Sequence, residues 1–92
     1  MTGLSLQSRP RLAPGCRLSD SQGAQAVLLM PEGALRLNDT GLKITQLCTG
    51  NHSLSEIIDQ LSADFVLLDR QNIEKDTINF LTRLHDKRVV DF

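Results

Sequence analysis

Hydrophobic and polar positions divide the chain into an N-terminal half with the pattern of strands and a C-terminal half with the pattern of helices. Residues 16–19, 26–30 and 34–37 are short runs separated by turn-forming residues. The central run is apolar throughout, which suits a strand covered on both faces, whereas residues 34–37 alternate. Pro31 and Gly33 favour a tight turn between these two runs. We therefore predict a three-stranded antiparallel meander whose third strand, residues 34–37, has one free edge.

After residue 38 the apolar residues recur every three or four positions, as on a helix that packs by one face. The first predicted helix covers residues 40–48, and the polar residues 38–40 offer a choice of N-caps. Its inner face consists of Ile44, Leu47 and Cys48. Gly50 is placed to end this helix, because glycine accepts the left-handed conformation that follows many helices.

The second helix has the clearest start, since Ser53 and Glu56 have the spacing of a capping box, in which each side chain binds the other residue's backbone N–H. Its apolar face is formed by Leu54, Ile57, Ile58, Leu61 and Phe65. The third helix is predicted over residues 69–87. Its main apolar face is formed by Ile73, Thr77, Phe80, Leu81 and Leu84. We expect the apolar residues 66–68, which connect these two helices, to join the core.

The remaining segments are predicted to be extended or turns. Two prolines within residues 9–15 favour extended backbone, so we predict that residues 1–15 form an N-terminal arm lying on the body. Residues 19–25 have turn composition, and residues 89–92 can extend as a final strand or fold back as an apolar tail. Residues 16–92 are predicted to form a single winged-helix-like domain. The arm can also swap onto a second copy, which leaves a homodimer open.

Composition fits one small domain and argues against several classes of function. The 92 residues are 40% hydrophobic and 23% charged, with a formal net charge of −1. The aromatic residues are three Phe, so stacking of successive bases is poorly supported, and no basic tract would attract nucleic acid or a membrane. Neither a secretory signal nor an apolar run of transmembrane length occurs, which predicts a cytoplasmic protein.

The polar residues do not have the spacing of a catalytic or metal site. His52, His85, Cys16 and Cys48 fit no catalytic triad, CxxC motif or usual zinc-ligand spacing. The acidic residues of the predicted helices are scattered, and the glycines are too far apart to form a phosphate-binding loop. We therefore predict no enzymatic activity, no cofactor and no bound metal.

The free edge of the third strand is the best remaining candidate for a functional surface. Its unpaired N–H and C=O groups can accept an extended peptide as a further strand. The edge could instead be protected by its short length, by Arg36 and by the third helix, and the residues alone support both readings equally. Three strands and three helices also fit a winged helix-turn-helix regulator that binds DNA, but acidic residues on the third helix nearly cancel its basic ones.

Three groups of residues resemble a known family. They are Arg9-Pro10-Arg11-Leu12-Ala13-Pro14-Gly15-Cys16-Arg17-Leu18, then Pro31-Glu32-Gly33 with Leu37-Asn38-Asp39-Thr40, and then Ile44, Leu47-Cys48 and Gly50. The family is PqqD, the small peptide chaperones of pyrroloquinoline quinone (PQQ) biosynthesis. The similarity covers nearly the whole chain after Ser8.

The resemblance implies an α+β, winged helix-turn-helix-like fold in which a three-stranded antiparallel sheet precedes three helices. Such domains recognise precursors of ribosomally synthesised and post-translationally modified peptides (RiPPs). Family members bind the precursor peptide PqqA as an added strand and present it to the radical SAM enzyme PqqE, without catalytic residues of their own. Carried over by position, the peptide-binding residues are Ala34, Leu35, Arg36, Leu37, Ile73, Thr77, Phe80, Leu81 and Leu84. Recognition of another ribosomally made modified peptide stays as an alternative.

Overall fold

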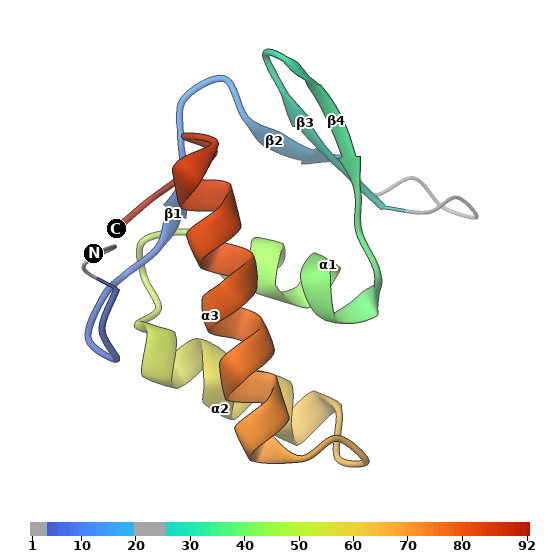
Figure 1. The fold of residues 1–92 in the computed structure, drawn as a ribbon, viewed down its shortest axis with the longest axis vertical. Helices are drawn as coiled ribbons and strands as arrows, with labels where there is room; N and C mark the ends of the chain where they lie inside the picture. The colour runs from blue at the N-terminus through green and yellow to red at the C-terminus, as the bar shows by residue number, and fades with distance from the viewer. Residues whose placement is uncertain (1–3, 20–25) are drawn as a thin grey trace.

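A three-stranded antiparallel sheet is followed by three helices, and a short pair of strands joins the two ends of the chain (Figure 1). The computed structural model describes residues 4–19 and 26–92. The elements are β1 Arg11–Leu12, β2 Arg17–Ser19, β3 Val27–Met30, β4 Gly33–Arg36, α1 Asp39–Gln46, α2 Leu54–Asp64, α3 Arg70–Asp86 and β5 Val90–Asp91. This arrangement confirms the predicted α+β fold class. The turn predicted at residues 19–25 lies, after Ser19, outside the described residues.

The sheet has the strand order β2-β3-β4, with β3 in the centre, which confirms the predicted meander. Met30 pairs with Gly33, so the chain reverses through the two residues between them. β4 therefore starts one residue earlier than predicted, at Gly33, which has a φ of +153°. Leu37 lies beyond the end of β4, although its N–H still donates to the Ala26 carbonyl at 2.9 Å.

Local polar contacts set the starts of α1 and α2. Asn38 is the N-cap of α1, and its side-chain oxygen accepts a hydrogen bond from the Gly41 N–H at 2.8 Å. The capping box of α2 is present as predicted: the Ser53 hydroxyl accepts from the Glu56 N–H at 3.2 Å, and the Glu56 carboxylate accepts from the Ser53 N–H at 2.8 Å. α3 lies within the predicted range of residues 69–87, with Asp69 as its N-cap.

The prediction that Gly50 ends α1 was wrong, because the helix already ends at Gln46. Gly50 lies three residues past the C-cap with a φ of +82°, a conformation that side chains disfavour. Its N–H donates to the Pro10 carbonyl at 3.0 Å. The glycine thus lets the loop after α1 bind the N-terminal arm.

The N-terminal arm is joined to the body by backbone hydrogen bonds. The Ser8 carbonyl accepts from the Leu54 N–H at the start of α2 at 2.8 Å. β1 then pairs antiparallel with β5, so residues near the two ends of the chain are neighbours in space. Of the two conformations left open for residues 89–92, the chain therefore adopts a strand at Val90–Asp91.

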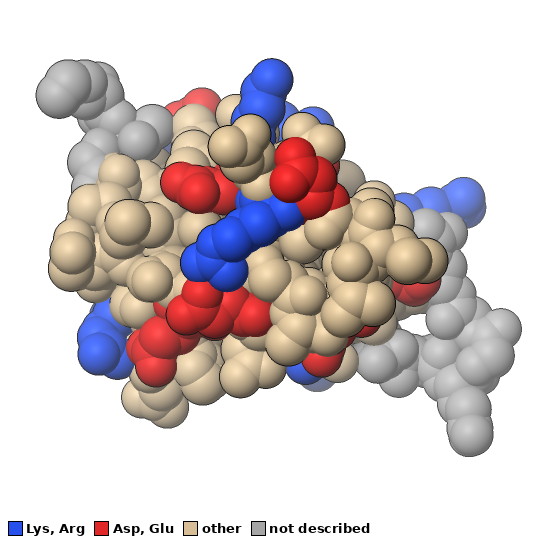
Figure 2. Space-filling view, turned by 90° about the horizontal axis from the view of Figure 1, so that it is seen from below, with Lys and Arg blue, Asp and Glu red and all other residues tan. Residues whose placement is uncertain are grey.

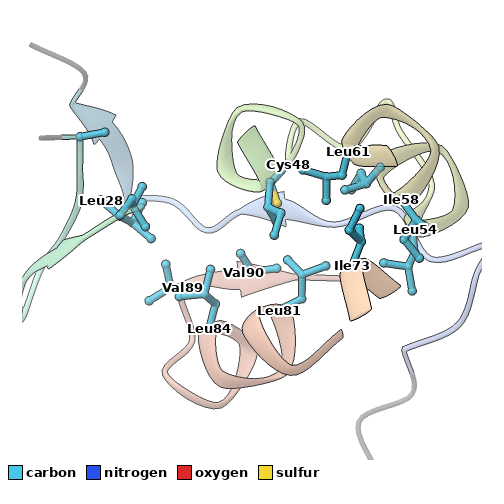
Figure 3. Packing of buried hydrophobic residues seen from close by; sticks show 14 residues of the cluster. Leu28, Cys48, Leu54, Ile58, Leu61, Ile73, Leu81, Leu84, Val89 and Val90 are labelled. Carbon is cyan, nitrogen blue, oxygen red and sulfur yellow. The ribbon is translucent and has the colours of Figure 1, made fainter. Parts of the chain in front are cut away.

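The hydrophobic core lies between the three helices and reaches the sheet through Leu28. Its buried side chains are Ala26, Leu28, Leu37, Ile44, Cys48, Leu54, Ile57, Ile58, Leu61, Ile73, Leu81, Leu84, Val89 and Val90. Figure 3 shows side chains of α3 facing those of α2 and Cys48, which follows α1, with Leu28 at the sheet end. The predicted inner face of α2 is confirmed at its four buried positions, whereas Phe65 and Phe80 are only partly buried.

The connection between α2 and α3 was predicted wrongly. Val66, Leu67 and Leu68 are 76%, 97% and 48% exposed, so they are not part of the core. α2 ends at Asp64 and α3 begins at Arg70, and the chain must reverse direction between them. The connection therefore protrudes past the ends of both helices, whatever the hydrophobicity of its residues.

Among the helices of the described residues, none has the length and hydrophobicity needed to span a membrane.

Candidate functional site

Ala34 and Arg36 form an unpaired outer edge of the sheet. In an antiparallel pair, successive residues direct their backbone groups alternately toward and away from the partner strand. The Leu37 N–H donates toward the β3 side, so by alternation Leu35 also faces β3 while Ala34 and Arg36 face outward. Both outward residues are exposed, and none of the described strands pairs with this edge. The edge therefore offers two N–H donors and two C=O acceptors to a ligand.

A hollow of about 380 Å³ separates β4 from the C-terminal half of α3. From the sheet side it is lined by Leu35, Arg36, Leu37 and Asn38. From α3 it is lined by Phe80, Arg83, Leu84 and Lys87. An extended chain added to β4 would thus have a helix along its side and an apolar floor beneath alternate side chains.

A second hollow of about 670 Å³ continues this groove between α1 and the N-terminal half of α3. The two hollows share Asn38, Phe80 and Arg83, so they adjoin each other. Apolar side chains in the second hollow are Ile44, Leu61, Leu68, Ile73 and Phe80. We call the two hollows together the β4–α3 groove.

The structure brings most of the predicted binding residues to the β4–α3 groove. Leu35, Arg36, Leu37, Phe80 and Leu84 line the hollow beside β4, and Ile73, Thr77 and Phe80 line the hollow beside α1. Ala34 lines neither hollow but lies on the outer edge. Leu81 lines neither hollow and is completely buried, so it supports α3 from within the core.

Sequence reasoning missed several polar side chains of the groove, although it included Arg36 and Thr77. Asn38 was considered only as a helix cap, yet it lines both hollows. Arg83 and Lys87 follow Phe80 by three and seven positions, so helical periodicity places them on the face that Phe80 occupies. That spacing could have identified both residues.

The thiols, histidines and acidic residues of the described chain do not form a reactive site. Burial raises the pKa of the Cys48 thiol to about 12, which keeps it protonated and unreactive at neutral pH. Both cysteines are free, and the ring of His85 lies 4.4 Å from that of Phe92. Within residues 4–19 and 26–92, no three His, Cys, Asp or Glu side chains come close enough to hold a metal ion.

Known proteins are similar to this chain in both fold and sequence. One is the PqqD portion of Methylobacterium extorquens PqqCD, whose solution NMR structure is described as a stand-alone RiPP recognition element. It is 32% identical to this chain with a TM-score of 0.81, and the match covers 99% of this chain and 97% of that one. The crystal structure of PqqD from Xanthomonas campestris is 38% identical, has a TM-score of 0.60 and covers 97% and 99%. The PqqA binding protein of Xanthomonas axonopodis pv. citri is 38% identical over 91 residues, which are 98% of each chain.

A three-stranded sheet followed by three helices, superimposing on the Methylobacterium domain over almost its full length, is the fold of a RiPP recognition element. Residues 25–90 match the family model for coenzyme PQQ synthesis protein D (PqqD). The chain belongs to the PqqD family.

Proposed function

We propose that this chain binds the precursor peptide PqqA by adding it as a strand along β4. The observation that carries this proposal is the exposed outer edge of β4 facing a hollow lined by α3. It is supported by the family match and by relatives at 38% identity that are named PqqA binding proteins. Recognition of this kind needs no catalytic group in the chain itself.

Backbone hydrogen bonds would supply the attraction, and the groove would supply selectivity. Ala34 and Arg36 can form up to four hydrogen bonds with an extended peptide, as in other cases of strand addition. Alternate side chains of the peptide would then face the hollow formed by Leu35, Leu37 and Phe80. Leu81 is completely buried and anchors α3 in the core, so this wall is in place before a peptide binds.

We further propose that the bound precursor is presented to the radical SAM enzyme PqqE. A peptide held along β4 is covered on one side by the sheet and on another by α3, and its remaining surface stays open to an enzyme. Addition of PqqE to the preformed complex should therefore yield a ternary complex rather than displace the peptide. Analytical size-exclusion chromatography with labelled PqqA measures this, and release of free PqqA by PqqE would contradict it.

An NMR titration with one proline variant tests strand addition directly. Saturating PqqA should shift the backbone amide signals of Ala34, Arg36 and the groove face of α3, and should leave the capping box at Ser53 unchanged. Ala34→Pro removes one outward donor and should weaken binding by about fivefold, the effect of one hydrogen bond worth about 1 kcal/mol. Ala34→Thr keeps the N–H and is the matched control, and circular dichroism verifies that both variants fold.

The proposal fails if saturating PqqA leaves the NMR signals of the β4 backbone amides unshifted. It also fails if Ala34→Pro, still folded, binds PqqA as tightly as Ala34→Thr. Duplex DNA at low salt serves as a comparison ligand in the same titration, since a DNA-binding regulator would respond to it in a salt-dependent way.

A further inference from the structure

The two hollows of the β4–α3 groove differ in charge. The hollow beside β4 is lined by Arg36, Arg83 and Lys87 and by no acidic residue. The hollow beside α1 is lined by Asp69 and Asp76, with Arg83 at the boundary that the two hollows share. The groove is therefore basic at the sheet end and acidic at the end where α2 passes into α3.

The periodicity of α3 fixes this order of charges. Asp69, Asp76, Phe80, Arg83 and Lys87 are separated by seven, four, three and four positions, which places them on one face of the helix. At 1.5 Å per residue, Asp76 and Arg83 are about 10 Å apart along the axis, and Asp69 and Lys87 about 27 Å apart. An extended peptide spans these distances with about three and eight residues, respectively.

Within residues 4–19 and 26–92, none of the charged side chains of the groove forms a salt bridge. The salt bridges of the described residues join Lys43 to Asp64 at 2.9 Å and Arg70 to Asp59 at 2.6 Å, and neither includes a charged residue that lines the groove. Figure 2 views the molecule from the α2–α3 end and shows acidic side chains on both sides of a basic one there. Five unpaired charges on one groove are an electrostatic pattern to which a ligand can be complementary.

We propose that the β4–α3 groove selects a precursor peptide whose charges run in the opposite order. An acidic side chain lies in the segment that pairs with β4, near Arg36, Arg83 and Lys87. The peptide continues along α3, places an apolar side chain in the hollow beside α1, and carries a basic side chain or its amino terminus near Asp69 and Asp76. The acidic and basic groups are separated by about three to eight residues, from the helix and strand rises.

This inference rests on the proposed function, because it concerns the peptide that binds to β4. It adds the hollow beside α1 as a second subsite and defines the class of peptide by charge order. The floor of that hollow is apolar, with Ile44, Leu61 and Ile73 buried beneath it, so a side chain entering it leaves water. The acidic rim then sets which charge can follow that side chain.

Charge reversals in the protein test the order. Fluorescence anisotropy with labelled PqqA precursor peptide at low salt gives dissociation constants for wild type, Arg83→Glu and Asp76→Lys. Both variants should weaken binding by about tenfold, and the effect should shrink as salt rises. Lys75→Glu and Glu74→Lys make the same charge changes on another face of α3, outside the groove, and should stay within about twofold of wild type.

A peptide variant distinguishes the order of charges from a general electrostatic effect. A PqqA precursor with its acidic residues changed to Lys should bind Arg83→Glu more tightly than wild type, and should still be weakened by Asp76→Lys. Tighter binding of unmodified PqqA to Asp76→Lys would overturn the inference, because the whole peptide would then behave as an anion. Equal binding by all variants, with the β4 amides still shifting, would overturn it and leave strand addition intact. If wild type binds no PqqA at all, it is the proposed function that fails.

Discussion

Replacing Phe80 with alanine tests whether the two hollows act as one peptide-binding groove. Phe80 lies near the middle of α3, is partly buried, and lines both hollows. Its ring also approaches α1, because a Cβ built on Gly41 would lie 3.6 Å from the Cζ atom of Phe80. Removal of the ring therefore affects the wall beside β4 and the floor beside α1 together.

The size of the effect follows from how much of the ring is still exposed. Complete burial of a Phe side chain contributes about 1.5–3 kcal/mol, and most of that is already gained in the free protein because Phe80 is partly buried. A peptide that covers the remaining exposed part, at most about a third of the side chain, gains up to about 1 kcal/mol from it, which is a change of up to about fivefold in Kd. The free energy of unfolding should fall by about 2–3 kcal/mol, roughly two thirds of the cost of a fully buried Phe→Ala change.

Isothermal titration calorimetry with PqqA measures the binding term, and urea unfolding measures the stability term. Ile78→Ala is the matched control, because Ile78 is on α3 and partly buried but lines neither hollow of the groove. It should lose a similar stability and leave the Kd within about twofold of wild type. If Phe80→Ala binds PqqA as tightly as Ile78→Ala does, the groove is not the binding surface and the reasoning is refuted.

Three further predictions concern parts of the chain outside the groove. Ser53→Ala should lower the free energy of unfolding by about 1 kcal/mol in urea without changing the Kd for PqqA, and a changed Kd would contradict this separation. The backbone N–H of Ser53 lowers the pKa of Glu56, so the contribution of this hydrogen bond is present above the ordinary pKa of 4.5 and is lost as pH falls through the lower folded pKa. In urea curves between pH 3 and 6, Glu56→Gln should lack that acid sensitivity, because its side chain does not titrate, and an unchanged pH profile would argue against it. A thiol reagent at pH 8 should modify Cys16 in the folded protein and both cysteines in urea. The reason is that Cys48 is buried in the folded protein, where its thiol has a pKa of about 12. Rapid reaction of Cys48 in the native state would contradict this and show that the core opens.

Local signals in the sequence predicted local structure well. Ser53 and Glu56 are three residues apart and bind each other's backbone, so their role depends on nothing outside α2. The apolar face of α2 and the turn before Gly33 were identified for the same reason. Leu67 shows the limit, because hydrophobicity cannot tell whether a helix connection turns into the core or protrudes from it.

Contacts between distant segments could not be read from the sequence. The pairing of β1 with β5 joins residues almost the whole chain apart, and neither two-residue strand has a pattern of its own. Gly50 illustrates the same point, since its left-handed backbone binds Pro10 rather than ending the preceding helix. For Arg83 and Lys87 the helical spacing indicates only that they share the face of Phe80, and their place beside β4 depends on the packing of α3 against the sheet.

The antiparallel pairing of β1 with β5 affects how easily such a domain can be fused to another polypeptide. β1 near the N-terminus and β5 near the C-terminus lie side by side on one side of α3, while β4 lies on the other (Figure 1). A longer polypeptide could therefore enter and leave through neighbouring points without crossing the groove. The Methylobacterium relative illustrates this, since it is the PqqD portion of a PqqCD polypeptide and is functional when separated from it. Evolution can thus exchange such a domain between a free protein and a covalent module of an enzyme by gene fusion or fission alone.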